Sequence, residues 1–191
     1  MSGIDRLIVA LDHPNAGAAL AQVDRLGEEV TRYKVGLELY LAEGRRIVDE
    51  VRAREKKVFL DLKLHDIPET VRRASEGIAA LGIDLMTVHA AGGEAMMKAA
   101  VDATKTAGVK VLAVTVLTSL DQRDLAKDGH STTVTELVLQ RALLAARAGC
   151  AGVVASPKEI TALRRVVGDA FMIVTPGVRP EGHTAGGDDQ K

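Results

Sequence analysis

Short runs of aliphatic and β-branched residues recur along this chain at a nearly constant interval. The seven runs cover residues 7–11, 31–35, 58–62, 84–88, 109–116, 152–155 and 171–174. The first five begin about 26 residues apart, which is the length of one strand, one helix and two short loops. Amphipathic segments lie between them, for example at residues 16–30, 47–54, 70–81 and 94–107. Strict alternation of strand and helix predicts a parallel sheet covered by helices.

Two α/β architectures fit this alternation, a closed (β/α)8 barrel and an open doubly wound sheet. Polar side chains gather where the predicted strands end: Asp12, Lys34, Asp61, Lys63, His89, Thr118 and Arg179. In a barrel, these ends surround one shared mouth that holds the active site. The first turn, with the sequence DHPNAG, has no GxGxxG dinucleotide fingerprint. We therefore predict a TIM barrel.

A barrel of this kind needs an eighth strand, whereas the sequence shows seven strand-like runs and then GHTAGGDDQK. We expect an α/β (β/α)8 TIM barrel that lacks the last helix and the eighth strand. No linker or low-complexity segment divides the chain. Residues 1–191 are therefore expected to form a single (β/α) barrel domain, incomplete at its C-terminal end.

The composition argues against several classes of partner. A net charge of -1 gives no general attraction to nucleic acid or to anionic membranes. No stretch approaches the ~18 apolar residues of a membrane span, and the N-terminus shows no signal-peptide pattern. The single cysteine, Cys150, rules out an internal disulfide and suits a reducing compartment. We expect a cytoplasmic protein that binds neither nucleic acid nor membrane.

The stretch FLDLKLHDIPETV, residues 59–71, follows a buried strand with alternating charges. Asp61 and Lys63, at i and i+2, should point to the same side, which at the end of a barrel strand is the pocket. Charges inside a barrel are costly unless they are paired, so a structural salt bridge and a functional pair are both open. Asp66 is either functional or the N-cap of the next helix. Lys34, on a buried strand, is expected to point into the same mouth.

Six blocks carry a resemblance to a known family: VALD at residues 9–12, YKVGLELY at 33–40, DLKLHDIPETV at 61–71, VHAAGG at 88–93, AVTVLTSL at 113–120 and TPGVRPEG at 175–182. In this order and spacing they closely resemble the orotidine 5'-phosphate decarboxylase family. The match spans nearly the whole chain, and the six blocks together are far more specific than a lone DxKxxD.

The resemblance implies a carboxy-lyase that makes UMP in de novo pyrimidine biosynthesis without a cofactor. It also implies a homodimer with shared active sites. Lys34, Asp61, Lys63 and Asp66 would form an alternating charge array, with Asp66 reaching the other subunit's site. Asp61 would lie against the substrate carboxylate, and Lys63 would protonate C6 of the pyrimidine.

The resemblance further implies the residues that hold the nucleotide. These are Asp12, Lys34, Asp61, Asp66, Ile67, Thr70, Thr118, Arg179 and Gln190. Asp12 and Lys34 would contact the ribose, and Thr118 would contact the pyrimidine. Thr70 would reach the neighbouring subunit's substrate, and Arg179 and Gln190 would grip the 5'-phosphate.

Two other functions remain open. The five histidines show no spacing typical of a metal site on one element, and we predict no metal. A magnesium-dependent phosphosugar barrel enzyme, of the hexulose-phosphate synthase or keto-gulonate-phosphate decarboxylase type, is nevertheless conceivable, because Glu38 could supply a carboxylate beside Asp61. A non-catalytic fragment or nucleotide binder is the third possibility.

Overall fold

The computed structural model describes residues 6–178 and contains one parallel seven-stranded sheet. The strands are β1 (Val9–Ala10), β2 (Arg32–Gly36), β3 (Lys57–Leu64), β4 (Leu85–His89), β5 (Lys110–Val114), β6 (Gly152–Val154) and β7 (Met172–Val174). Each strand pairs with the strand that precedes it in the chain, so the order in the sheet is the order in the sequence. All seven predicted strands are present, although β3 runs two residues further than its apolar run indicates.

Helices fill the intervals between the strands. They are α1 (Ala16–Leu26), α2 (Leu37–Glu43), α3 (Arg45–Ala53), α4 (Pro68–Ala79), α5 (Gly93–Thr104), α6 (Gln122–Lys127), α7 (Val134–Arg147) and α8 (Ile160–Val167). Short 3-10 turns extend some of them, at Gly27–Glu29 after α1 and at Lys105–Ala107 after α5. The four predicted helical segments correspond to α1, α3, α4 and α5, with shifted ends.

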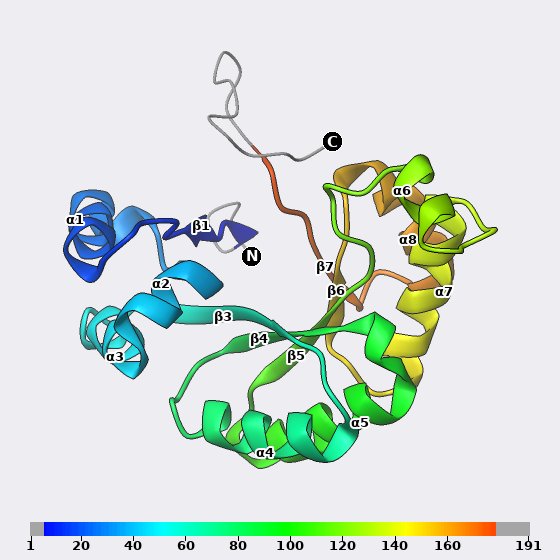
Figure 1. Cartoon of the computed structure of the whole chain (residues 1–191). Coiled ribbons are helices and arrows are strands. Elements are labelled where there is room, and N and C mark those ends of the chain that lie inside the picture. The colour runs from blue at the N-terminus through cyan, green and yellow to red at the C-terminus, as the bar shows by residue number, and fades with distance from the viewer. Residues whose placement is uncertain (1–5, 179–191) are drawn as a thin grey trace.

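The sheet curls, and the helices lie along its outer side (Figure 1). A doubly wound sheet would reverse its strand order at a switch point and carry helices on both faces. The uninterrupted order from β1 to β7 instead matches a (β/α) barrel wall. Within residues 6–178, β1 and β7 are the two edges of the sheet, and no pairing joins them. The predicted barrel class is confirmed.

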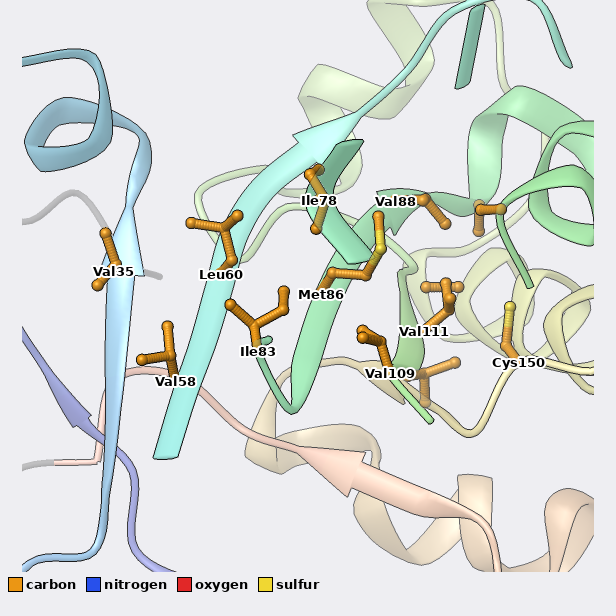
Figure 2. Packing of buried hydrophobic residues seen from close by; sticks show 14 of the residues in the cluster. Val35, Val58, Leu60, Ile78, Ile83, Met86, Val88, Val109, Val111 and Cys150 are labelled. Atoms are coloured by element: carbon orange, nitrogen blue, oxygen red, sulfur yellow. The ribbon is translucent and has the colours of Figure 1, made fainter. Parts of the chain in front are cut away.

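Alternation along the strands divides the apolar residues into two layers. The larger layer lies between the sheet and the helices and includes Val58 and Leu60 of β3 and Met86 of β4, with Ile78 of α4 packed nearby (Figure 2). A smaller cluster on the opposite face of the sheet holds Phe59 with residues of the next two strands. Burying each such side chain contributes about 1.5–3 kcal/mol, so the two layers fix the sheet against its helices.

The same alternation decides which polar residues face the inside of the curl. Asp61 lies two residues beyond Phe59 on β3, and Thr87 lies two residues beyond Leu85 on β4. Because Phe59 and Leu85 belong to the inner cluster, Asp61 and Thr87 follow them toward the carboxyl ends of the strands. The inside of the curl is therefore apolar at its base and charged at its mouth. Within the described chain, no helix is long and apolar enough to cross a membrane.

Candidate active site

Charged side chains from β1, β2 and β3 meet at the mouth of the curled sheet. Lys34 of β2 pairs in register with Ala10 of β1, and Asp12 follows two residues later. On the other side, Gly36 of β2 lies opposite Asp61 of β3. Parallel pairing thus brings the carboxyl ends of three successive strands to one place.

The side chains at this place form a chain of alternating charges. The Lys34 ammonium donates a hydrogen bond to Asp12 Oδ1 at 2.9 Å and lies 3.9 Å from Asp61 Oδ2. The Lys63 ammonium donates to the same Asp61 Oδ2 at 2.8 Å. The Asp61 side chain is 12% exposed, whereas that of Asp12 is 66% exposed. A carboxylate as buried as Asp61 is stable only when such partners compensate its lost hydration.

We name Asp12, Lys34, Asp61 and Lys63 the charge cluster. The structure brings these four predicted site residues together, and the expected ion pair between Asp61 and Lys63 is present. Glycine at position 36 leaves space here, because a Cβ there would lie 3.1 Å from Lys34 Nζ and would push the ammonium aside. The close approach of the backbone leaves the ammonium room to lie between the two carboxylates.

Three predicted site residues of the segment after β3 lie outside the charge cluster. Asp66, Ile67 and Thr70 are all exposed in this single chain. The interpretation of Asp66 as the N-cap of the next helix is wrong: α4 begins at Pro68, its N-cap residue is Ile67, and no side chain caps it. Asp66 Oδ1 instead accepts a hydrogen bond from the Ile67 N–H at 2.6 Å. Asp66 is thus an exposed carboxylate at the rim of the mouth.

Glu69 does not take part in capping either. Its carboxylate accepts hydrogen bonds from Arg72 and Arg73. The hydrogen bonds from these two arginines hold the pKa of Glu69 down at about 2. The first turn of α4 therefore carries a solvated ion-pair network, not a capping box.

Two histidines lie beside the charge cluster. The rings of His65 and His89 are 5.4 Å apart and tilted by 41°. Burial lowers the pKa of His89, and electrostatic interactions with His65, Lys63 and Arg141 lower it further. His89 is therefore neutral at physiological pH, which avoids a further cation at the mouth.

Thr118 belongs to a neighbouring pocket of about 220 Å³. Ser156 and Glu159, which follow β6, line it together with Thr118, and so do Val116 and Val138. None of the four charge-cluster residues lines this pocket. The pocket combines an apolar wall with hydroxyl and carboxylate groups, and it is smaller than a typical pocket for a drug-sized ligand.

The two residues predicted to bind phosphate, Arg179 and Gln190, lie outside the described residues. Glu38, considered for a magnesium site, is exposed in the first turn of α2. Between residues 6 and 178, no group of three or more His, Cys, Asp or Glu side chains is arranged to hold a metal ion.

Sequence reasoning missed Thr87. Its side chain is buried, and its hydroxyl lies 2.9 Å from both Asp61 Oδ1 and the Lys63 backbone nitrogen. The only sequence signal is a single hydroxyl residue inside the apolar strand run LMTV, at the same strand parity as the inward-facing Leu85. Such a residue occurs in many buried strands without a functional role.

Comparison with known proteins places this geometry in a family. The profile of the Orotidine 5'-phosphate decarboxylase / HUMPS family matches residues 5–191. Orotidine 5'-phosphate decarboxylase of Rhodopseudomonas palustris (strain HaA2) is 49% identical over 187 residues, which cover 98% of this chain and 78% of that protein. The protein of the same name from Nostoc sp. (strain PCC 7120) is 47% identical over 195 residues, which cover 98% of this chain and 81% of its own.

Solved structures agree with the sequence comparison. The crystal structure of orotidine 5'-phosphate decarboxylase from Lactobacillus acidophilus superposes with a TM-score of 0.85 at 40% identity, covering 91% of this chain and 81% of the other. An uncharacterized conserved protein from Geobacillus kaustophilus gives a TM-score of 0.84 at 41% identity, covering 88% of this chain and 82% of the other. With its sequence blocks, its curled parallel sheet and its full-length profile match in agreement, the chain belongs to the orotidine 5'-phosphate decarboxylase / HUMPS family.

Proposed function

We propose that this chain decarboxylates orotidine 5'-phosphate to UMP in pyrimidine biosynthesis. Family membership and relatives of that name at 47–50% identity support the reaction. The observation that carries the proposal is the position of the Lys63 ammonium, 2.8 Å from Oδ2 of the buried Asp61 carboxylate. A cation next to a desolvated anion is the arrangement needed where neutral CO2 leaves a carboxylate and its negative charge moves to the carbon left behind.

The reaction follows from these two groups. The substrate carries its carboxylate on C6 of the pyrimidine, and we place it against Asp61, where like charges repel. Cleavage of the bond between C6 and the carboxylate releases CO2 and leaves the electron pair on C6. Lys63 stabilises that pair and donates a proton to C6, giving UMP, and then regains a proton from water. The side chains supply both the charge and the proton, so the proposal needs no cofactor.

Lys34 and Asp12 keep the charge cluster in place and contact the ribose. Lys34 lies between two carboxylates, 2.9 Å from Asp12 and 3.9 Å from Asp61. Its ammonium group therefore balances the second carboxylate charge, which Lys63 alone would leave uncompensated. Asp12 is mostly exposed and is free to accept a ribose hydroxyl. Thr118, in the neighbouring pocket, is assigned to the pyrimidine. Arg179 and Gln190 are assigned to the 5'-phosphate on the resemblance alone.

We further propose a homodimer in which Asp66, Ile67 and Thr70 complete the partner's site. Large apolar side chains are exposed on α2 and in this segment: Leu37 at 54%, Leu41 at 75% and Ile67 at 67%. Leu37 and Leu41 are four residues apart on α2 and thus share a face of that helix. Both α2 and the Ile67 segment follow the carboxyl ends of adjacent strands, so a second copy would cover apolar surface and charged rim together.

A single (β/α) barrel domain over residues 1–191 and a cytoplasmic location complete the proposal. The sheet order without a switch point supports the single domain. The free, buried thiol of Cys150 suits a reducing compartment.

The test is the fall in ultraviolet absorbance as purified chain converts orotidine 5'-phosphate to UMP, measured with a chelator present. Lys63→Ala is expected to lower kcat/KM by at least about a thousandfold, because it removes both the proton donor and the stabilising charge. Lys98→Ala is the matched control, since Lys98 is an exposed lysine of α5 that pairs with Asp102 on the same helix. Equal rates for the Lys63 and Lys98 variants would contradict the mechanism.

The magnesium-dependent phosphosugar reaction has less support. Two ammonium groups already lie within 4 Å of Asp61, and their charge opposes a divalent cation at that carboxylate. Activity on a phosphosugar that disappears with chelator, in a chain inert toward orotidine 5'-phosphate, would overturn the decarboxylase proposal in favour of this reaction. A folded chain inert toward both would favour the non-catalytic alternative.

A further inference from the structure

The pairing of β3 with β4 breaks down beside the charge cluster. Leu60 of β3 lies opposite Met86, but Leu64 lies opposite Val88. Three residues of β3, from 61 to 63, therefore lie opposite the single residue Thr87. Lys63 adopts a φ of 53°, a left-handed conformation that costs roughly 1–2 kcal/mol for a residue with a side chain.

The hydroxyl of Thr87 replaces the interrupted pairing. It accepts a hydrogen bond from the Lys63 N–H at 2.9 Å and donates one to Asp61 Oδ1 at 2.9 Å. One hydroxyl has one proton to donate and lone pairs to accept with, so it can make both bonds at once. Thr87 is only 1% exposed, so water does not compete for either bond.

This pair of bonds sets the direction of both catalytic side chains. With Oδ1 of Asp61 bound to Thr87, Oδ2 is turned toward the ammonium groups of Lys63 and Lys34. With the Lys63 N–H held, the backbone keeps the left-handed turn from which the lysine side chain reaches back to Asp61. A rotation of the carboxylate or a relaxation of the turn would separate the groups.

We propose that Thr87 is a positioning residue for the decarboxylation. It holds the Asp61 carboxylate and the Lys63 backbone in the geometry in which Lys63 delivers its proton. The inference rests on the proposed function, because it assigns Thr87 to the same reaction. It adds a residue that touches neither the reacting carbon nor the phosphate and acts through the two groups that do the chemistry.

The test compares isosteric variants. Thr87→Val keeps the shape and removes the hydroxyl, and we expect kcat to fall by about 10- to 100-fold, the cost of a small misplacement of catalytic groups. Affinity for UMP, which lacks the carboxylate, should stay within about threefold of the wild-type value, because the nucleotide contacts remain. Thr87→Ser restores the hydroxyl and should recover most of the lost kcat.

A matched control separates positioning from a general loss of packing. Thr104 is also 1% exposed, and its hydroxyl donates to the backbone of α5, away from the cluster. Thr104→Val makes the same chemical change and should leave kcat unaltered. The inference is wrong if Thr87→Val retains the wild-type kcat. It is also wrong if Thr87→Ser loses as much kcat and as much UMP affinity as Thr87→Val does.

Amide hydrogen exchange gives a readout that needs no activity. In Thr87→Val the Lys63 N–H loses its acceptor, so its exchange should be faster than in wild type by about tenfold or more, while Thr87→Ser keeps the protection. Unchanged exchange at Lys63 in Thr87→Val would overturn the inference even if the enzyme is active. Inactive wild-type protein with the predicted exchange pattern would instead count against the proposed function and leave the role of Thr87 in holding the turn intact.

Discussion

Cys150 shows how burial changes the chemistry of a single side chain. It follows α7 and is 5% exposed, in the layer between sheet and helices. Burial raises the pKa of its thiol to about 12, because the charged thiolate would lose its hydration there. The thiol therefore stays neutral and acts as a small apolar group.

This shift predicts how stability depends on pH. The unfolded chain releases the thiol proton near pH 9, whereas the folded chain holds it up to about pH 12. The folded state is thus favoured fully below pH 9 and loses that advantage as pH rises toward 12. We expect wild-type protein to lose about 1 kcal/mol more unfolding free energy between pH 8 and pH 10 than Cys150→Ala does. Urea unfolding at the two pH values measures this, and parallel losses in both proteins would contradict it.

At the residue scale, the sequence predicted which charges meet but not how they are held. The ion pair between Asp61 and Lys63 was derived from strand alternation, yet Lys63 lies in a left-handed turn where regular alternation fails. The pair forms because Thr87, 24 residues away in sequence, holds the turn. A hydrogen bond to a distant strand leaves no local signal, so the sequence could not reveal the turn.

Among the elements, β6 and β7 leave no room for a side chain at Gly152. A Cβ at this position would lie 2.2 Å from the Met172 carbonyl oxygen and 2.5 Å from its Cβ. Gly152 pairs in register with both Leu112 of β5 and Met172 of β7, so it lies inside the sheet with a strand on each side. The strands cannot separate on one side without disturbing the other.

The substitution Gly152→Ala should therefore destabilise the protein by about 2–3 kcal/mol, through overpacking against backbone atoms. Gly77→Ala is its counterpart: Gly77 lies in α4, and a Cβ there meets nothing within 4 Å. We expect Gly77→Ala to stabilise the protein by about 0.5–1 kcal/mol, because alanine is the better helix former. Thermal unfolding of both variants should shift in opposite directions, and shifts of the same sign would refute the packing argument.

Element boundaries were predictable only where local signals set them. The amphipathic pattern located α3, α4 and α5, whereas α2 was missed because it is only seven residues long and follows β2 directly. The start of α4 was misjudged through Asp66, which resembles a cap, yet Pro68 at the first helical position sets the start without one. Asp66 and Pro68 are both plausible signals for the N-terminus of a helix, and the sequence alone did not show which of them marks the start of α4.

For the whole molecule, the exposed leucines of α2 predict self-association. We expect wild-type protein to sediment as a dimer and Leu41→Glu to sediment as a monomer with strongly reduced activity, because the charge opposes burial and the partner's Asp66 and Thr70 are lost. Leu143→Glu on α7 is the control, since Leu143 is also exposed, at 41%. A monomeric wild type, or dissociation by Leu143→Glu alone, would place the interface elsewhere or remove it.

The fold class was the part most fully determined by the sequence. The regular spacing of apolar runs required alternating strands and helices, and the polar strand ends favoured a barrel. The spacing could not reveal contacts between strands, such as the close approach of the Met172 backbone to Gly152. The spacing of apolar runs was thus enough to predict the architecture, whereas contacts between strands became visible only in the structure.

The sequential order of the strands also bears on how the protein is made. Each strand pairs with the one synthesised just before it, so a strand that leaves the ribosome meets an edge that already exists. Synthesis at about 5–20 residues per second gives each unit of about 26 residues seconds to dock, far longer than helices and strand pairs need to form. Asp12, Lys34, Asp61, Lys63 and Thr87 all lie in the first four units. The charge cluster and Thr87 can therefore come together on the nascent chain while the second half of the sheet is still being translated.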